Sequence, residues 1–187
     1  MVDIYTLVTP RLRLRPWRDD DLAPFARING DPVVMKHFVA PLDRAASDEL
    51  VERQRGRFGR GEFGFWATVL ADDDTLIGCV GLAASNLPVP FAPYVEIGWR
   101  LGKEWWGRGY APEAAHAALL YAFEVRGVDE VVAMTTPKNT PSRRVMEKLG
   151  MSYSPADDFD HPSLPEEHPL RRHVLYRLAK DDWKRNV

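Results

Sequence analysis

The sequence is short of cysteine, of net charge and of long apolar runs. Cys79 is the only cysteine in 187 residues, which excludes an intramolecular disulfide and fits a reducing cytoplasm. No apolar run approaches the roughly 20 residues of a membrane span, and the N-terminus lacks the charged-then-apolar pattern of a signal peptide. We therefore expect a cytoplasmic protein with no membrane partner, in which Cys79 is a small buried residue of an apolar strand.

The near-balance of charge excludes a further class of proteins. A formal net charge of −2 lacks the large basic excess of a general nucleic-acid binder, so we expect no nucleic-acid partner. Apolar residues make up 45% of the chain, an ordinary share for a globular protein. With 187 residues and no linker-like tract, the chain is expected to form one domain over residues 1–187.

Residues 94–111 hold the strongest pattern in the chain. They begin with a strand-like alternation, in which one face carries Val95, Ile97, Trp99 and Leu101 and the other carries Tyr94, Glu96, Gly98 and Arg100. A turn containing Gly107 and Gly109 follows, and Pro112 opens a helical pattern. Glycines allow close approach to backbone N–H groups, the helix dipole favours negative charge, and Arg108 adds a cation. This arrangement predicts a phosphate-binding site.

Two common phosphate-binding motifs do not fit this stretch. A nucleoside-triphosphate P-loop requires Gly-x4-Gly-Lys-Ser/Thr, and the Lys-Ser/Thr pair is missing here. A dinucleotide fingerprint requires Gly-x-Gly-x-x-Gly in a βαβ unit, and Pro112 occupies the place of the third glycine. The surrounding elements also have the pattern of an antiparallel sheet.

Two blocks resemble the GNAT superfamily of N-acetyltransferases. Residues 106–111, Trp-Gly-Arg-Gly-Tyr-Ala, resemble its acyl-coenzyme A loop, Gln/Arg-x-x-Gly-x-Gly/Ala, at both small-residue positions and depart from it at Trp106. Residues 139–151 are similar to its Asn-x-x-Ser/Ala…Glu-Lys-Leu-Gly-Phe segment. Residues 11–17 and 96–99 resemble the subgroup that includes ribosomal-protein N-terminal alanine acetyltransferases.

The resemblance implies an α/β (α+β) fold with a mixed, mostly antiparallel sheet flanked by helices. It also implies acetyl-coenzyme A (acetyl-CoA) as co-substrate, no metal, and acetyl transfer to a primary amine. Cys79 lies in the wrong place for a covalent intermediate, so we expect direct transfer in a ternary complex. The residues expected to bind acetyl-CoA, partly through their backbones, are Trp99, Arg100, Leu101, Trp106, Gly107, Arg108, Gly109, Tyr110, Ala111, Asn139 and Ser142.

Two residues are candidates for the chemistry. Glu96 is the candidate general base, because the family often uses a carboxylate on this strand and the amine must lose a proton. The alternative for Glu96 is a cross-strand ion pair with an arginine. Ser142 is the candidate donor to the departing thiolate, since Met146 stands where many relatives have a tyrosine. The alternative for Ser142, and likewise for Asn139, is a residue at the helix start that satisfies the backbone.

The acceptor is less constrained than the acetyl donor. The resemblance favours the N-terminal α-amine of a protein, followed by a small amine such as a polyamine, an amino acid or a drug. The departures at Trp106 and Met146 leave a third interpretation, a non-catalytic acyl-CoA sensor or interaction module. The acidic connection 157–167 either attracts a cationic acceptor or is a solvated hairpin. With His161 and His168 it matches no metal-ligand spacing.

Hydrophobic periodicity and turn residues place the remaining elements. Strands are expected at residues 11–17, 63–71, 75–85, 129–136, 151–155 and 172–179. Helices are expected at residues 22–30, 45–58, 112–126 and from the N-cap Thr140 to Gly150. The proline-containing connection 86–93 cannot be a regular strand, and it either borders the acceptor site or is a surface connection.

Overall fold

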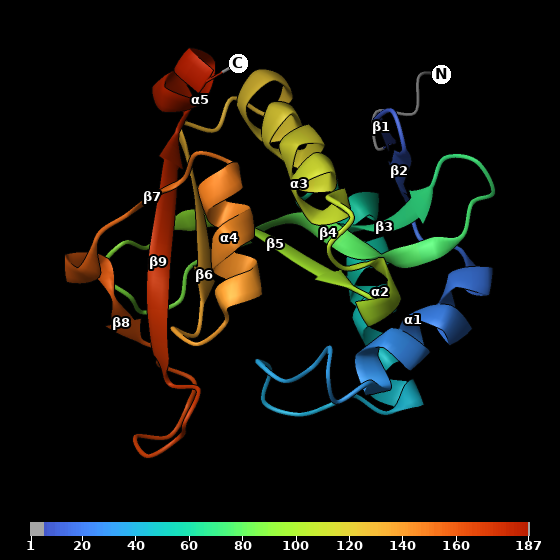
Figure 1. Ribbon diagram of the computed structural model, residues 1–187, viewed down its shortest axis with the longest axis horizontal. Helices are drawn as coiled ribbons and strands as arrows, with labels where there is room; N and C mark the ends of the chain where they lie inside the picture. Colours follow the sequence, from blue (N-terminus) through green and yellow to red (C-terminus); the bar gives the residue numbers. More distant parts are fainter. Residues whose placement is uncertain (1–5, 187) are drawn as a thin grey trace.

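The computed structural model describes residues 6–186, including the side chains of residues 6–183. The strands form a nine-stranded sheet in the order β1-β2-β3-β4-β5-β6-β9-β7, with β8 paired to β9 (Figure 1). They span Leu7–Val8 (β1), Leu12–Arg15 (β2), Phe65–Leu70 (β3), Leu76–Ser85 (β4), Tyr94–Leu101 (β5), Glu130–Thr135 (β6), Ser152–Tyr153 (β7), Phe159–Asp160 (β8) and Arg172–Ala179 (β9). Among the described strands only β5 and β6 are parallel neighbours.

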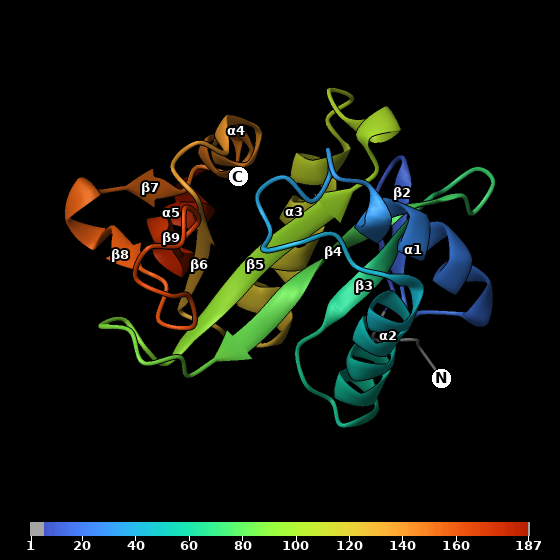
Figure 2. The same cartoon turned by 90° about the horizontal axis from the view of Figure 1, so that it is seen from below.

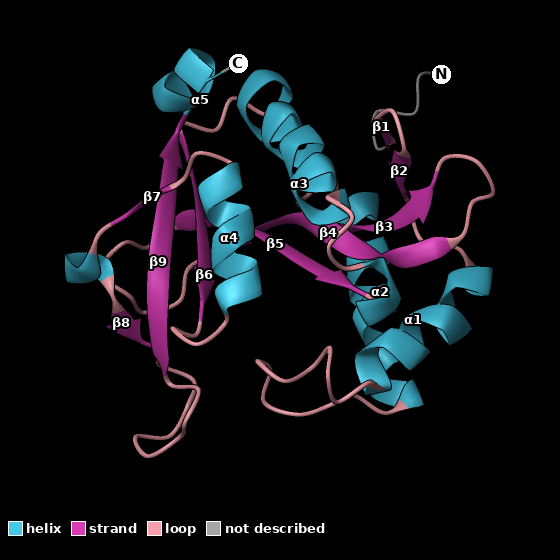
Figure 3. Cartoon of the chain, in the orientation of Figure 1, coloured by secondary structure: helices cyan, strands magenta, loops and turns pink. Residues whose placement is uncertain are grey.

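Helices flank the sheet (Figure 3). They span Leu22–Gly30 (α1), Arg44–Gly59 (α2), Tyr110–Leu120 (α3), Thr140–Lys148 (α4) and Lys180–Asn186 (α5), with a π-helical turn at Tyr121–Val125 after α3. Helices α1 and α2 pack together on one face of the sheet, whereas α3 and α4 lie on the other (Figure 2). Within the described residues, no helix combines the length and the apolar composition needed to cross a membrane.

The core lies on both sides of the sheet. Trp66 of β3 is 1% exposed, and its ring centroid lies 5.5 Å from those of Phe58 in α2 and Tyr121 after α3. A second, smaller cluster contains Tyr94, Val132, Phe159 and Leu175. Side chains of the connection 86–93 pack against this second cluster, so that connection is anchored to β5, β6, β8 and β9.

The structure confirms the expected fold class and most of the expected elements. Helix α3 begins earlier than Pro112, because Gly109 precedes its first turn in the left-handed conformation. The prediction that Thr140 caps α4 is wrong. Asn139 is the N-cap, and its side-chain oxygen accepts a hydrogen bond from the Ser142 N–H. Cys79 is buried within β4, as expected.

Candidate active site

Strand β5 parts from its neighbour β6 near Glu96. On its other side, β5 pairs with β4 in one continuous antiparallel register, so no bulge rotates the predicted alternation of its side chains. Toward β6, the paired position among the described residues is Glu96 with Val132. Beyond this position the two strands diverge (Figure 2). The edge of β5 that follows Glu96 is therefore free to form hydrogen bonds with a ligand.

The main chain of β5 presents different residues to its two edges. Successive residues of a strand direct their N–H and C=O groups to opposite edges. The glycine that follows Leu101 donates its N–H to the Ile77 carbonyl of β4 at 3.0 Å. By this alternation, the main-chain groups of Trp99 and Leu101 face the free edge, whereas those of Arg100 face β4. The indole Nε1 of Trp106 donates to the Leu101 carbonyl at 2.9 Å, so the residue that departs from the family motif ties the following loop to β5.

Residues 106–111, which we call the glycine loop, lead from β5 into α3. Gly107 and Gly109 have φ values of +74° and +81°, a left-handed conformation that costs other residues roughly 1–2 kcal/mol. The first N–H groups of α3 have no acceptor inside the helix, and they donate to no other group in the described part of the chain. The exposed Arg108 lies 5.3 Å from the ring of Trp105. The loop thus combines free N–H donors, the positive end of a helix dipole and a cation, which together form an anion site.

An ion pair from the start of the sheet braces the glycine loop. Arg11 donates to the Glu113 carboxylate from Nε at 2.6 Å and to the Arg108 carbonyl from Nη1 at 3.0 Å. The Thr9 hydroxyl donates to the same carboxylate at 2.6 Å. Burial acts to raise the pKa of Glu113, but the hydrogen bonds from Thr9 and Arg11 outweigh it and lower the pKa. Sequence analysis missed this brace, because Arg11 and Glu113 are 102 residues apart and no local pattern links them.

Glu96 is half-buried on the face of β5 that looks toward α1. Its strand neighbours are Ala83 in β4 and Val132 in β6, and it forms no ion pair with a described lysine or arginine. The alternative of a cross-strand ion pair is therefore not what the structure contains. Burial raises the pKa of Glu96 to about 7. A carboxyl group with this pKa exchanges a proton near neutral pH, as a general base must.

Helix α4 packs against β6 and α3 (Figure 1). The Asn139 amide is engaged at both ends, since Nδ2 donates to Thr135 Oγ1 at 2.8 Å and Oδ1 accepts from the Ser142 N–H at 3.4 Å. The capping role that was the alternative for Asn139 is therefore present. The Ser142 hydroxyl forms no hydrogen bond within the described residues and is free for a ligand. Met146 is 1% exposed and belongs to the core.

The connection 31–43 between α1 and α2 crosses the face of β5 that carries Glu96 and Arg100 (Figure 2). The His37 Nδ1 atom lies 3.1 Å from Thr136 Oγ1 just beyond β6, and the ring of Phe38 lies 4.2 Å from the guanidinium carbon of Arg100. Phe38 is 40% exposed. The sequence does not predict that this connection reaches the end of β6, because the contact between His37 and Thr136 spans 99 residues.

The acidic connection 157–167 has much of its charge paired. Asp157 pairs with Arg177 at 3.2 Å, and Asp160 pairs with Arg172 at 3.4 Å. Both arginines come from β9, the strand against which this segment folds back. The pairing favours the interpretation of a solvated hairpin over that of a cation-attracting surface. No group of three or more His, Cys, Asp or Glu in the described ranges could hold a metal ion.

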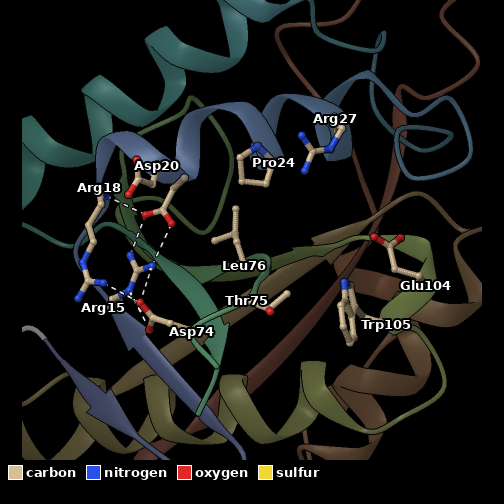
Figure 4. A pocket seen from close by; sticks show the side chains of 11 residues that line it. Arg15, Arg18, Asp20, Pro24, Arg27, Asp74, Thr75, Leu76, Glu104 and Trp105 are labelled. Atoms are coloured by element: carbon tan, nitrogen blue, oxygen red, sulfur yellow. Dashed lines mark hydrogen bonds and ion pairs between the residues drawn. The ribbon is translucent and has the colours of Figure 1, made fainter. Parts of the chain in front are cut away.

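A polar cavity of about 460 Å³ lies between β2, α1 and the turn before β4 (Figure 4). Four of its charged side chains are paired with one another, since Arg15 donates to Asp21 at 2.7 Å and Arg18 pairs with Asp74 at 2.6 Å. None of the residues expected to bind acetyl-CoA or to act on the amine lines it. We therefore assign this cavity no part in acetyl transfer.

Comparison with known proteins identifies relatives of this fold and site. A family model described as "Acetyltransferase (GNAT) domain" matches residues 11–152. The uncharacterized protein YkkB of Bacillus subtilis is 35% identical over 150 residues, which cover 79% of this chain and 86% of YkkB. The FsC-acetyl coenzyme A-N(2)-transacetylase of Aspergillus fumigatus is 29% identical over 197 residues, covering 96% of this chain and 78% of that enzyme. A GNAT-family acetyltransferase structure from Bacillus anthracis aligns with a TM-score of 0.79 at 24% identity, over 94% of this chain and 99% of that one.

The resemblance to the ribosomal-protein subgroup is weaker. The [Ribosomal protein uS5]-alanine N-acetyltransferase of Escherichia coli is 28% identical over 87 residues, which cover 46% of this chain and 43% of that enzyme. This match is too short to carry over an acceptor. The family-model match, by contrast, includes β5, the glycine loop and the start of α4. The chain belongs to the GNAT family of acetyltransferases, for which acetyl-CoA is the co-substrate.

Proposed function

We propose that this protein transfers the acetyl group of acetyl-CoA directly to a primary amine within a ternary complex. The observation that carries the proposal is the position of Glu96. Its carboxyl group lies where β5 leaves β6, on the strand that leads into the glycine loop, and burial tunes its pKa to about 7. A donor bound along the free edge of β5 therefore brings its reactive end next to a group that can take a proton.

Binding of acetyl-CoA uses the glycine loop and the free edge of β5. The diphosphate accepts hydrogen bonds from the N–H groups of the loop and of the first turn of α3, including Tyr110 and Ala111, with Arg108 adding charge. The pantetheine arm forms strand-like hydrogen bonds with the main chain of Trp99 and with the Leu101 N–H, since the Leu101 carbonyl already accepts from the Trp106 indole. Asn139 and Ser142 border the opposite side of the arm from α4. An acetyl-CoA contact by the Asn139 amide replaces one of its present hydrogen bonds.

The transfer step needs one proton acceptor and one group that stabilises the leaving thiolate. The amine nitrogen attacks the thioester carbonyl carbon, and a C–N bond forms while the C–S bond breaks. Glu96, in its carboxylate form, takes the proton that the nitrogen loses, directly or through water. The thiolate sulfur leaves with the bonding electron pair, and the hydroxyl of Ser142 donates a hydrogen bond to it. Met146 takes no part, because it is buried in the core and has no proton to give.

The pKa of Glu96 bears on the acceptor. A base with a pKa of about 7 is nearly matched to an α-amine, whose pKa is about 7.7–8, and poorly matched to a lysine amine near 10.4. This matching favours the N-terminal α-amine of a protein, or a small amine of similar pKa, over a lysine side chain. The remaining alternative is an acyl-CoA-binding module without turnover. Measurements of turnover and of thermal unfolding distinguish such a module from an enzyme.

Glu96→Gln tests the proposal. We expect it to lower turnover about 10²–10⁴-fold, as loss of a general base does, because glutamine keeps the shape of the side chain but cannot accept the proton. Turnover is measured as release of free CoA thiol over a panel of α-amines, polyamines and peptides. The kcat/KM of the natural chain should rise with pH through about 7, and the variant should keep only the rise that the pKa of the acceptor amine itself produces.

Thermal unfolding separates loss of chemistry from loss of binding. Acetyl-CoA or CoA at 100 times its dissociation constant stabilises by about 2.7 kcal/mol, whereas ATP should not. Glu96→Gln should retain the acetyl-CoA shift, and Glu167→Gln, in the exposed part of the acidic connection, should retain both binding and turnover. Unchanged turnover in Glu96→Gln would refute the base assignment. An acetyl-CoA shift without turnover on any amine would leave only the binding module.

A further inference from the structure

Arg100 is a half-buried cation without a carboxylate partner. Its side chain projects from the same face of β5 as Glu96, and its Nη1 donates to the Asn29 Oδ1 at 2.6 Å. The ring of Phe38 packs over the guanidinium at 4.2 Å. The Nε–H group is buried and has no hydrogen-bond partner. Within the described residues no aspartate or glutamate lies within ion-pair distance of Arg100.

Three other arginines with buried or partly buried side chains have carboxylate partners, whereas the partly buried Arg143, which forms no ion pair in the described part of the chain, donates instead to the Tyr176 hydroxyl and the Pro137 carbonyl. The side chains of Arg15, Arg55 and Arg177 are 7%, 28% and 28% exposed, and each forms an ion pair with a carboxylate. The corresponding distances are 2.7, 2.8 and 2.8 Å. Proteins rarely leave such a charge unmatched, because desolvation without a counter-charge is costly. Arg100 therefore has the character of a binding residue whose anion comes from outside the chain.

The groups that face Arg100 offer no internal anion. Cys79 lies directly opposite on β4, and burial raises the pKa of its thiol to about 11, so the thiol is neutral. Asp31, just after α1, pairs with Lys103 at 2.8 Å. Burial lowers the pKa of Arg100, but a guanidinium stays charged at physiological pH.

The support of Arg100 is rigid. Asn29 is fully buried, and its Nδ2 donates to the Oγ of the equally buried Ser47 at 2.8 Å. This bond fixes the amide orientation, so that Oδ1 is presented to Arg100. A cation that is held by a strand, an anchored amide and an aromatic ring has lost its side-chain freedom before any ligand binds. Such a guanidinium keeps donors available for a planar carboxylate.

We propose that Arg100 binds a carboxylate carried by the amine acceptor, so that the substrate class of the enzyme is acidic amines. This inference rests on the proposed function, since it takes Glu96 as the group that receives the amine. Glu96 and Arg100 are four residues apart on one strand, roughly 13 Å between their Cα atoms at 3.3 Å per residue. Their long side chains shorten this span. The acceptor therefore carries its amine and its carboxylate several bonds apart.

Two sources present this chemistry. One is a small amino acid or short peptide with a free carboxylate at the end opposite its amine. The other is a protein N-terminus with an aspartate or glutamate in its first few residues. Pairs of amines that differ only in having a carboxylate or the corresponding amide distinguish the two sources. We would compare triglycine with its C-terminal amide, 5-aminopentanoate with its amide, and an amidated Ala-Glu-Gly peptide with its Ala-Gln-Gly counterpart.

The readout is the ratio of kcat/KM for acid and amide. In the natural chain we expect the acid to be preferred about 10- to 100-fold in at least one pair, the discrimination a charge-assisted hydrogen bond supplies. Arg100→Gln should reduce this ratio to near one, mainly through KM. Arg100→Lys should keep part of it, since it retains the charge but not the planar fork. Arg53→Gln, on the exposed side of α2, removes the same charge elsewhere and should leave the ratio unchanged.

Each outcome of these measurements either supports or overturns the inference about Arg100. Equal kcat/KM for acid and amide in the natural chain, in every pair, overturns the inference and leaves the proposed function standing, because amides are still acetylated. If Arg100→Gln lowers kcat/KM equally for the acid and the amide, the arginine has only a structural role through its hydrogen bond to Asn29, and the inference is overturned. If Arg100→Gln does not fold, the acid preference of the natural chain and its decline with salt still test the inference. Failure to acetylate any amine counts against the proposed function itself.

Discussion

Glu96→Gln provides a test of the electrostatics of the site that needs no acceptor. Burial raises the pKa of Glu96 from 4.5 to about 7. The folded protein then holds this proton more tightly than the unfolded chain. The contribution to stability is fully present below pH 4.5 and is lost as the pH rises through 7. At 1.36 kcal/mol per pH unit, the carboxylate costs the folded state about 3 kcal/mol at pH 8.

Glutamine has nearly the shape of the protonated acid and does not ionise. Relative to the natural chain, Glu96→Gln should therefore gain stability that grows from below about 1 kcal/mol at pH 5 to about 3 kcal/mol at pH 8. For a domain of this size, 3 kcal/mol raises Tm by roughly 6–12 °C. Turnover should fall in the same variant, so stability and activity move in opposite directions, as expected where a site holds a desolvated charge.

Thermal and urea unfolding at several pH values measure this difference. Glu167→Gln, the exposed control, should follow the natural chain at every pH. If Glu96→Gln and the natural chain are equally stable at pH 8, the carboxylate is not desolvated, and burial is not what sets its pKa. If Glu96→Gln is more stable than the natural chain by an amount that does not change with pH, the gain comes from packing and not from ionisation of the carboxyl group.

Two further substitutions test the glycine loop and the direct transfer. Gly109→Ala places a side chain at φ +81°, with its Cβ 3.4 Å from Arg11 Nη2, so we expect a loss of roughly 1–2 kcal/mol in stability and a smaller thermal shift with acetyl-CoA. Gly59→Ala, where an added Cβ meets nothing within 4 Å, is the control, and an undiminished acetyl-CoA shift in Gly109→Ala would contradict the loop assignment. Cys79→Ala should keep turnover, and the native thiol, whose pKa burial raises to about 11, should react slowly with thiol reagents at pH 8. Loss of turnover in a folded Cys79→Ala protein would argue against direct transfer.

Local patterns in the sequence predicted the parts of the site that lie close together in the chain. The alternation of β5 placed Glu96 on the correct face, and the glycines marked the turn before α3, because backbone conformation is set by neighbouring residues. The helix start at 139–142 shows the limit of this reasoning. Asn139 and Thr140 are both good N-caps, and only the side-chain hydrogen bond from Ser142 N–H to Asn139 distinguishes them.

Contacts between distant segments were not predictable in the same way. The pairing of Arg11 with Glu113 and the approach of His37 to Thr136 each join residues about a hundred positions apart. Both depend on the order of strands in the sheet, which brings the two ends of a long segment together. The proposed role of Arg100 was not predicted, for a different reason. The resemblance directed attention to its backbone, whereas its burial and its lack of a carboxylate partner are visible only in the folded chain.

The geometry of β5 explains how one strand can serve two substrates. Main-chain groups of a strand lie in the plane of the sheet, whereas its side chains stand perpendicular to that plane. Under the proposed function, the acetyl donor uses the free edge through Trp99 and Leu101, and the acceptor uses the face through Glu96 and Arg100. The two sets of contacts do not compete for the same atoms. A side-chain replacement on the face can therefore change which amine is accepted while the main-chain contacts to acetyl-CoA persist, and this separation lets one fold serve many acceptors.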